Sequence, residues 1–326
     1  MTDYIYAGID VSAKKLRVAA HEEFEVDNTS QAHQKLIGRL SWPGKAVRVC
    51  MESTGVYGLD LAVALDRAEG IEVMVLNPRV ARRFAEVLLK RSKTDPVDAR
   101  VLREYPQRMD FVPWTPPASE KLQLRALARR IAALTEMRTQ EKNRLHAAES
   151  CAELKIIRND LELNIRHLDR RIEQLESQAS QLIDRHRDFQ VPIARIISVK
   201  GIGLHSAIQI WGELCVLPSD LTPRQWVAHA GLDPRHFESG AFKGKTRISK
   251  TGNKYLRAAL YMPAHNAIVW EPCVMAFRDH LVENDKTKMQ AKVAVMRKLL
   301  HAIHGMIKNN ANFDGSKFYA GLKKSA

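Results

Sequence analysis

The sequence has few of the features that mark several familiar classes of protein. Its 326 residues contain only four cysteines (Cys50, Cys151, Cys215 and Cys273), which stand far apart and form no CxxC pair. With this spacing the sequence suggests neither a disulfide framework nor a structural zinc site. No run approaches the roughly 18 to 20 apolar residues that span a bilayer, and the N-terminus lacks a secretory signal. We therefore expect a cytoplasmic protein without a membrane segment.

Acidic residues are also in deficit. Aspartate and glutamate number 37 against 51 lysines and arginines, which gives a formal net charge of +14 at pH 7. A surplus of this size favours a polyanionic partner, because each phosphate that the protein neutralises releases condensed counterions. Nucleic acid is the first choice of partner and an anionic membrane surface the second. The hydrophobic fraction of 45% is that of an ordinary globular protein.

Residues 1–112 alternate the patterns of strands and helices. A sheet with helices packed against it follows from such alternation, so we expect an α/β domain here, closed by the Pro-rich segment 113–117. The expected strands are 4–11, 15–20, 22–26, 46–51 and 71–76, and the expected helices are 30–40 and 58–68.

Residues 113–192 are expected to form a helical connector, because hydrophobic residues recur there at alternating steps of three and four. The recurring positions are Leu124, Leu127, Ile131 and Leu134, and then Leu161, Ile165, Leu168, Ile172, Leu175, Ala179 and Leu182. This spacing predicts a coiled-coil seam, either within an antiparallel hairpin or between subunits. An ordinary pair of helices facing the core is the alternative, and in both cases the segment is a scaffold.

Residues 193–326 are expected to form a mostly helical C-terminal domain. Residues 196–213 read as a helix, a tight Gly-Ile-Gly turn and a second helix, a helix-hairpin-helix-like element. The first amides of the second helix can bind a phosphate there, but a simple corner between two helices gives the same pattern. A basic, glycine-containing segment follows at 233–257, and helices are expected from 254 to about 308.

Four acidic residues stand at positions suited to metal-assisted phosphoryl transfer. Asp10 and Glu52 lie at the ends of expected strands, and Asp95 and Asp98 are three apart at the start of a helix, where they share a face. Mg²⁺ prefers several oxygen ligands, so carboxylates from different elements must converge on it. Each acid alone has a structural alternative, as a helix cap, a turn-former or a surface carboxylate. Only the four together favour a site for one or two Mg²⁺ ions.

The start Gly-Ile-Asp-Val-Ser also raises a rival class, the sugar kinases and actin-like ATPases, which open with an aspartate on a first strand. Such proteins need a second phosphate-binding hairpin and an adenosine pocket, and the sequence offers no candidate for either. The stretch SGAFKGKT (residues 239–246) nearly matches a P-loop. It lacks the buried strand before it and the helix directly after it, so we reject ATP binding there.

The basic segment mixes cations, hydroxyls and glycines in a way that suits a loop closing on a phosphodiester backbone. A serine ester of DNA phosphate would store the energy needed to rejoin strands without ATP. By this chemistry alone Ser239, Thr246, Ser249 and Thr251 are equal choices. The cations that we expect to hold the DNA backbone are Arg235, Lys243, Arg247, Lys250 and Arg257.

Ordered motifs along nearly the whole chain carry a resemblance to a known family. They are GIDVSAKKL, MESTGVY, LNP, KTDPVDARVL, VPWTPP, GIG, WVAHAGLDPRHFESG and RISKTGNKYLRAALYMPA. In this order they resemble the DEDD recombinases of the bridge-RNA-guided insertion sequences, number 110 in the insertion-sequence nomenclature.

The resemblance implies a DNA transposase with a ribonuclease H-like N-terminal domain like that of Holliday-junction resolvases, a coiled-coil connector and a C-terminal transposase domain. The family's four acids fall on Asp10, Glu52, Asp95 and Asp98, and its nucleophilic serine on Ser239. It further implies a 5′-phosphoserine intermediate, a homo-oligomer up to a tetramer with active sites shared between protomers, and a bridge RNA that pairs with target and donor DNA. A hydrolytic junction nuclease and an inert nucleic-acid scaffold are the alternative functions.

Overall fold

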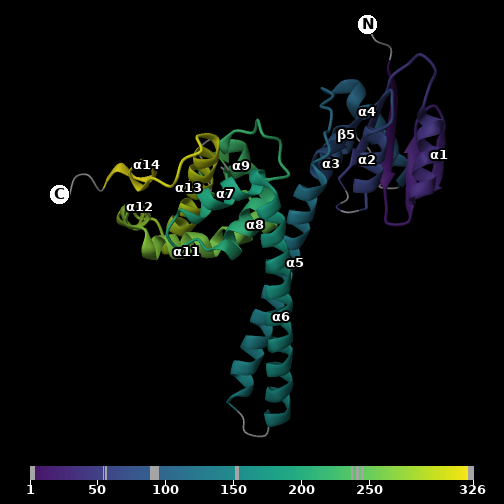
Figure 1. The fold of residues 1–326 in the computed structure, drawn as a ribbon. Coiled ribbons are helices and arrows are strands. Elements are labelled where there is room, and N and C mark those ends of the chain that lie inside the picture. The colour runs from purple at the N-terminus through teal and green to yellow at the C-terminus, as the bar shows by residue number, and fades with distance from the viewer. Residues whose placement is uncertain are drawn as a thin grey trace. The chain divides into compact units, whose positions relative to one another are not determined.

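The structure is a computed structural model that describes residues 4–53, 55, 57–88, 95–150, 154–235, 238–239, 242–243 and 246–321. The chain forms two compact units, Met1–Pro116 and Pro117–Ala326 (Figure 1). The expected connector and C-terminal region both belong to the second unit, where their residues share one hydrophobic core. The division into three domains stays a prediction.

The first unit is built on a five-stranded sheet, which confirms the expected α/β class. Its strands are β1 (Ile5–Val11), β2 (Lys15–Ala19), β3 (Glu23–Asp27), β4 (Val47–Glu52) and β5 (Ile71–Leu76). Their order is β3-β2-β1-β4-β5. β1, β2 and β3 are antiparallel neighbours, whereas β1, β4 and β5 run parallel. The carboxyl ends of the three parallel strands therefore meet at one edge of the sheet.

Helices cover both faces of this sheet. Alternate residues of β1 and β4, such as Ile9 and Met51, pack in one core with α1 (Ser30–Leu40) and α2 (Leu59–Asp66). The residues between them, such as Cys50, face the other side, because successive side chains of a strand point to opposite faces. There they pack with α3 (Pro78–Val87) and α4 (Asp95–Arg108). The sheet is thus buried on both sides, as parallel strands require.

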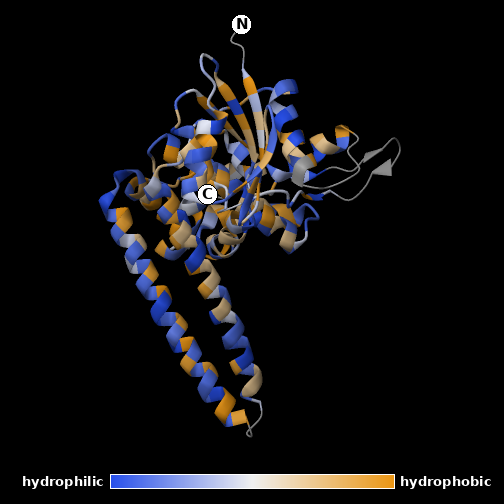
Figure 2. Cartoon of the chain, turned by 90° about the vertical axis from the view of Figure 1, so that its right-hand side faces the viewer, coloured by the Kyte–Doolittle hydropathy of each residue, from blue (hydrophilic) through white to orange (hydrophobic). Residues whose placement is uncertain are grey.

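The second unit begins with two long helices, α5 (Ser119–Ala148) and α6 (Lys155–Arg185), which pack along one another. In Figure 2 both helices are mostly hydrophilic, with hydrophobic residues recurring along them. The buried residues include most of the expected seam: Leu124, Ile131, Leu134, Leu161, Ile165, Leu168, Ile172 and Ala179. The helix pair is therefore confirmed, whereas coiled-coil geometry stays a prediction.

The rest of the second unit is a cluster of shorter helices around the same core. They are α7 (Arg187–Ile197), α8 (Leu204–Leu214), α9 (Pro223–His229), α10 (Lys254–Ala259), α11 (Tyr261–Trp270), α12 (Pro272–Glu283), α13 (Lys288–Lys308) and α14 (Gly315–Phe318). The mostly helical character expected to about residue 308 is confirmed. Between α9 and α10 lie four two-residue strands. None of the helices formed by the described residues is long and apolar enough to cross a membrane.

The Gly-Ile-Gly turn joins α7 to α8 and has a clear packing role. Gly201 has a φ of +92°, and a β-carbon there would lie 2.7 Å from the carbonyl carbon of Asn266 in α11. Glycine is thus required both for the backbone conformation and for the close approach. This observation accounts for the turn as a helix corner, and phosphate binding at the start of α8 stays a prediction.

Candidate active site

Asp10 and Glu52 lie at neighbouring positions near the carboxyl ends of two adjacent parallel strands. Ile9 on β1 pairs in register with Met51 on β4, and each acid is the next residue of its strand. Residues paired in register point to the same face. Ile9 and Met51 belong to the core under α1 and α2, so Asp10 and Glu52 face the side that α4 covers. Both acids are partly buried there.

Helix α4 reaches this face because Gly8 has no side chain. A β-carbon at Gly8 would overlap the carbonyl oxygen of Ala99 and the amide nitrogen of Arg103, and it would lie 2.9 Å from the carbonyl carbon of Leu102. The helix backbone thus rests directly on β1, two residues before Asp10. A glycine inside a strand often marks such a close backbone approach.

The first turn of α4 carries the other two acids. Asp98, which directly precedes Ala99, is partly buried. The helix begins at Asp95, whose side chain lies outside the described part of the structure. Two arginines of α4 contact the β2–β3 region of the sheet. Arg103 Nη1 donates to the carbonyl of Ala20, directly after β2, at 2.7 Å, and Arg100 Nη2 donates to Glu23 Oε2 on β3 at 2.8 Å.

The donor types fit Mg²⁺, because the set consists of carboxylates from three adjoining elements. The described side chains, which exclude that of Asp95, contain no group of three or more histidine, cysteine, aspartate or glutamate residues close enough to hold a metal. The structure thus places Asp10, Glu52 and Asp98 on adjoining elements without drawing them into a finished metal centre. Their role as ligands stays a prediction.

Cys50 lies two residues before Glu52 and faces the same side of the sheet. The thiol is fully buried, and this burial raises the pKa of Cys50 to about 12. Because the thiolate is the form that attacks phosphates, a thiol with so high a pKa is a poor nucleophile at neutral pH. Cys50 packs with Leu102 of α4 as a small apolar residue.

Ser239 lies in the second unit, on a short antiparallel pair of strands. β7 (Glu238–Ser239) pairs with β8 (Phe242–Lys243), with Ser239 opposite Phe242. The side chains of these four residues lie outside the described part of the structure. We call the whole excursion from Ala230 to Asn253 the serine loop.

The base of the serine loop is closed by hydrogen bonds between its outgoing and returning segments. β6 (Pro234–Arg235) pairs with β9 (Arg247–Ile248). Next to this pair, the Ser249 hydroxyl donates to Asp233 Oδ1 at 2.6 Å, and the Ser249 amide donates to the Asp233 carbonyl at 2.9 Å. The Lys250 amide donates to the Gly231 carbonyl at 3.1 Å. Ser249 is thereby engaged in holding the base.

The five predicted DNA-binding cations fall into different environments. Arg235, Arg247 and Lys250 are exposed around the base of the serine loop, where they are accessible to a nucleic-acid backbone. The Lys243 side chain lies outside the described residues. Arg257 is partly buried, and its Nη1 donates to the Ala230 carbonyl at 2.8 Å. Arg257 therefore has a structural role at the loop base, which the sequence alone did not reveal.

Sequence reasoning missed three further residues. The signal for Gly8 was its place inside a strand, two residues before Asp10. Glu213 and Asn253 form a buried polar network under the serine loop. An acid inside the apolar run of α8 was a signal for Glu213, whereas its partners lie far away in the sequence.

Two protein-family models match the chain. A model described as "Transposase", of the DEDD type and named for the insertion sequence IS110, matches residues 7–148. A second, described as "Transposase IS116/IS110/IS902 family", matches residues 193–278. The first match spans all four predicted acids and the second spans Ser239.

Full-length relatives agree with these matches. The chain is 27% identical over 320 residues to the "Pilin gene-inverting protein" of Moraxella bovis, covering 95% of this chain and 97% of that protein. The protein of the same name from Moraxella lacunata is 28% identical with the same coverage. The "Transposase for insertion sequence element IS1328" of Yersinia enterocolitica is 27% identical over 214 residues, covering 59% of this chain and 62% of that protein.

Proposed function

This chain belongs to the IS110 family of transposases, and on that basis we propose that it cuts and rejoins DNA by Mg²⁺-dependent transesterification through a serine–DNA ester. The proposal depends above all on the close contact of the α4 backbone with Gly8 of β1. This contact places the helix that bears Asp95 and Asp98 against the strand that bears Asp10, beside the end of β4 and Glu52.

The order of strands in the first unit supports the finer assignment of its fold. Three antiparallel strands are continued by two parallel ones, with the acids at the carboxyl ends of β1 and β4. This is the arrangement expected of a ribonuclease H-like domain, which we propose for residues 1–112. The basic charge of +14 supports contact with long phosphate backbones.

The reaction that we propose has two balanced steps. In the first, the Ser239 hydroxyl oxygen attacks the scissile phosphate, loses its proton, and forms a bond to phosphorus while the bond to the 3′ oxygen breaks. The departing strand takes up a proton and ends in a 3′ hydroxyl. In the second, the 3′ hydroxyl oxygen of another strand attacks the ester phosphorus and loses its proton while the bond to the Ser239 oxygen breaks, and the Ser239 oxygen takes up a proton. Mg²⁺ held by the four acids would stabilise the charge of the phosphoryl transition state.

We further propose that a bridge RNA selects the DNA by base pairing, as the resemblance to the family implies. The protein would then bind backbone and shape rather than base edges. The exposed arginines at the base of the serine loop suit that task, because a guanidinium pairs well with phosphate. The names of the Moraxella relatives describe inversion of a pilin gene, which supports rearrangement of DNA as the outcome for this chain.

The test is formation of a covalent protein–DNA adduct with purified protein, bridge RNA, labelled donor and target DNA, and Mg²⁺. We expect Ser239→Ala to abolish the adduct and the recombinant product while nucleic-acid binding is retained. The matched control is Thr251→Ala, which removes another exposed hydroxyl of the serine loop, one that donates to the nearby Ser249 carbonyl. That variant should form the adduct at close to the normal rate.

The same assay tests the metal. Chelation with EDTA should abolish adduct formation and added Mg²⁺ should restore it in the unmodified chain but not in Asp98→Asn. Asp66→Asn, an exposed acid at the end of α2, serves as the control and should behave normally. Recombination by Ser239→Ala would refute the serine nucleophile. Free 5′ phosphates without an adduct would indicate hydrolysis instead.

A further inference from the structure

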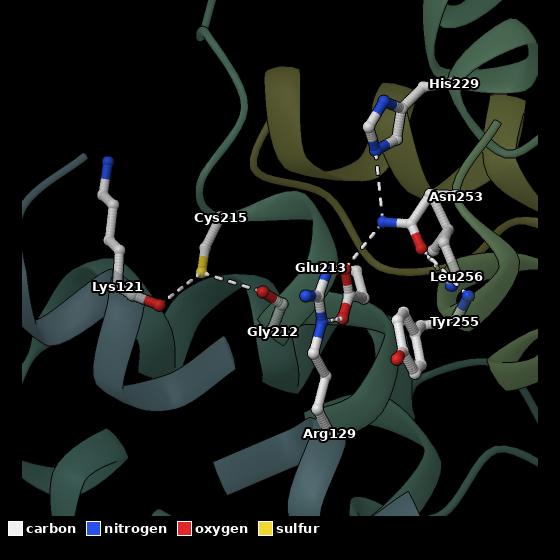
Figure 3. Close-up of polar contacts among 9 residues, drawn as sticks. All are labelled: Lys121, Arg129, Gly212, Glu213, Cys215, His229, Asn253, Tyr255 and Leu256. Carbon is white, nitrogen blue, oxygen red and sulfur yellow. Dashed lines mark hydrogen bonds and ion pairs between the residues drawn. The ribbon is translucent and has the colours of Figure 1, made fainter. Parts of the chain in front are cut away.

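A buried ion pair lies beneath the serine loop, between helices α8 and α5 (Figure 3). Glu213 of α8 is only 2% exposed. Arg129 of α5 donates to both of its carboxylate oxygens, from Nε to Oε1 at 2.6 Å and from Nη2 to Oε2 at 2.8 Å. Gly212 allows the helices to approach closely, since a β-carbon there would lie 2.8 Å from Ala128 Cβ.

Asn253, the last residue of the serine loop, joins this pair directly (Figure 3). Its Nδ2 lies 2.6 Å from Glu213 Oε2 and 3.3 Å from His229 Nε2. Its Oδ1 accepts hydrogen bonds from the Tyr255 and Leu256 amides and so caps α10. The Asn253 amide donates to the His229 carbonyl at 2.6 Å. One side chain therefore connects the loop to α8, α9 and α10.

Two groups of this network, Arg129 and His229, have pKa values shifted from their ordinary values. The hydrogen bonds that Arg129 donates to Glu213 raise the pKa of Arg129 despite its partial burial, so the guanidinium stays charged. Burial lowers the pKa of His229, which favours the neutral ring, whose Nε2 can accept from Asn253. The face of the Tyr255 ring lies 4.5 Å from the Arg129 guanidinium carbon.

A buried ion pair adds little to the free energy of unfolding, because the cost of desolvating both charges offsets much of their attraction. It does fix geometry, since two parallel hydrogen bonds from a guanidinium hold the carboxylate in one orientation. Glu213 therefore presents Oε2 to Asn253 at a fixed point. Because Arg129 lies on α5, the position of α5 determines where the base of the serine loop is held.

We propose that Glu213 and Asn253 are positioning residues for Ser239, and that they fix the serine loop to α5 during strand cleavage. This inference rests on the proposed role of Ser239 as the nucleophile. Small misplacements of a reacting group reduce rates steeply, by about 100-fold for an ångström. Releasing the loop should therefore slow the chemical step more than it weakens binding.

The main test is Asn253→Ser in the full chain. Serine is a good helix cap, so α10 keeps its first turn, but the shorter side chain cannot reach Glu213. Asn284→Ser is the matched control, because Asn284 Nδ2 donates to the His280 carbonyl at 2.7 Å, away from the loop. In single-turnover assays, ester formation should slow about 10- to 100-fold in Asn253→Ser with DNA affinity within about twofold of the unmodified chain.

Asn253→Asp supplies a readout that a purely structural role would not move. It keeps the cap but places a second carboxylate against Glu213, so the two must share a proton to restore the hydrogen bond. Like charges and burial raise the apparent pKa values of such a pair. The rate of Asn253→Asp relative to the unmodified chain should therefore rise as the pH falls. The groups facing this pair are Arg125 and Arg129 on α5, Cys215 directly after α8, and His229 on α9.

Hydrogen exchange at the Ser249 and Lys250 amides reports on the loop without depending on catalysis. It should quicken in Asn253→Ser and stay unchanged in Asn284→Ser. The inference is overturned if Asn253→Ser forms the ester at the normal rate, or if rate, DNA affinity and melting temperature fall together with no pH response in Asn253→Asp. If exchange quickens but Ser239→Ala still recombines DNA, the network seats the loop and the proposed nucleophile is wrong.

Discussion

The two units hold their predicted functional residues in opposite ways. In the first unit the main chain positions the acids. Strand register places Asp10 beside Glu52, and the backbone of α4 packs directly on Gly8, which brings Asp98 to the same face. In the second unit Ser239 lies on a two-residue strand, and the base of its loop depends on side chains such as those of Ser249 and Asn253 in addition to main-chain hydrogen bonds. The first arrangement should tolerate most side-chain changes except at Gly8, and the second should depend on a few polar groups.

Gly8→Ala should give the largest effect and separate the two units most clearly. Its methyl group would overlap the backbone of α4, which cannot move without leaving the sheet. We expect a loss of about 3 kcal/mol or more in the free energy of unfolding of the first unit. Calorimetry of the full chain should show the transition of the first unit shifted while that of the second stays in place.

Gly38→Ala is the control for this prediction. Gly38 lies inside α1, and a β-carbon there meets no atom within 4 Å. Alanine should stabilise the helix by about 1 kcal/mol or less. Equal stability losses from both substitutions would contradict the close approach of α4 to β1.

The pH dependence of stability should distinguish the network of the second unit. The pKa of His229 is lowered by burial, with Glu213 opposing and Arg129 reinforcing the change. The unfolded chain therefore binds the proton first as the pH falls, so the free energy of unfolding rises with pH just below the ordinary value of about 6.5 and declines on acidification. Replacing His229 with Gln should flatten this slope, by at most about 1.4 kcal/mol per pH unit.

His167→Gln serves for comparison, because His167 is exposed on α6. Urea titrations between pH 5 and 7 measure both slopes. An unchanged slope in His229→Gln would mean that the ring does not stay neutral in the folded chain.

The smallest effect should separate Arg247 from Arg257. Arg247 is exposed, so Arg247→Ala should remove about one unit from the slope of log affinity for DNA against log salt concentration. Arg257 donates to the Ala230 carbonyl, so Arg257→Ala should leave that slope nearly unchanged and instead quicken hydrogen exchange at the loop base. Fluorescence titrations at several salt concentrations measure the slope, and equal losses would refute the structural role of Arg257.

Elements with strong local patterns were predictable from the sequence. All five strands of the first unit and the helix pair of the second were expected from periodicity. Helix α3 was not, although its Asn77 cap and Pro78 at the first turn are a standard helix start. The seam on α6 also drifts: Ile183 is buried where Leu182 was expected, and Leu182 is only partly buried. An α-helix has 3.6 residues per turn, so it does not follow a 3.5-residue pattern.

The candidate site was predictable only in part, because local sequence patterns reveal strand ends but not long-range contacts between side chains. Strand ends identified Asp10 and Glu52 because the carboxyl ends of parallel strands share an edge. The contact of Arg129 with Glu213 joins residues 84 apart, and no local pattern encodes such a pairing. The choice of Ser239 among the hydroxyls came from family motifs, not from chemistry.

The length of α5 connects the Arg129–Glu213 pair to a distant part of the second unit. At 1.5 Å per residue its 30 residues extend about 45 Å, and Arg129 sits near one end, ten residues after Ser119. The part of α5 beyond Arg129 extends about 28 Å, so a tilt of about 10° about that residue would move the far end of the helix by about 5 Å. A partner that holds the far end of α5 would therefore act on the loop of the proposed nucleophile, Ser239, through the ion pair of Arg129 with Glu213.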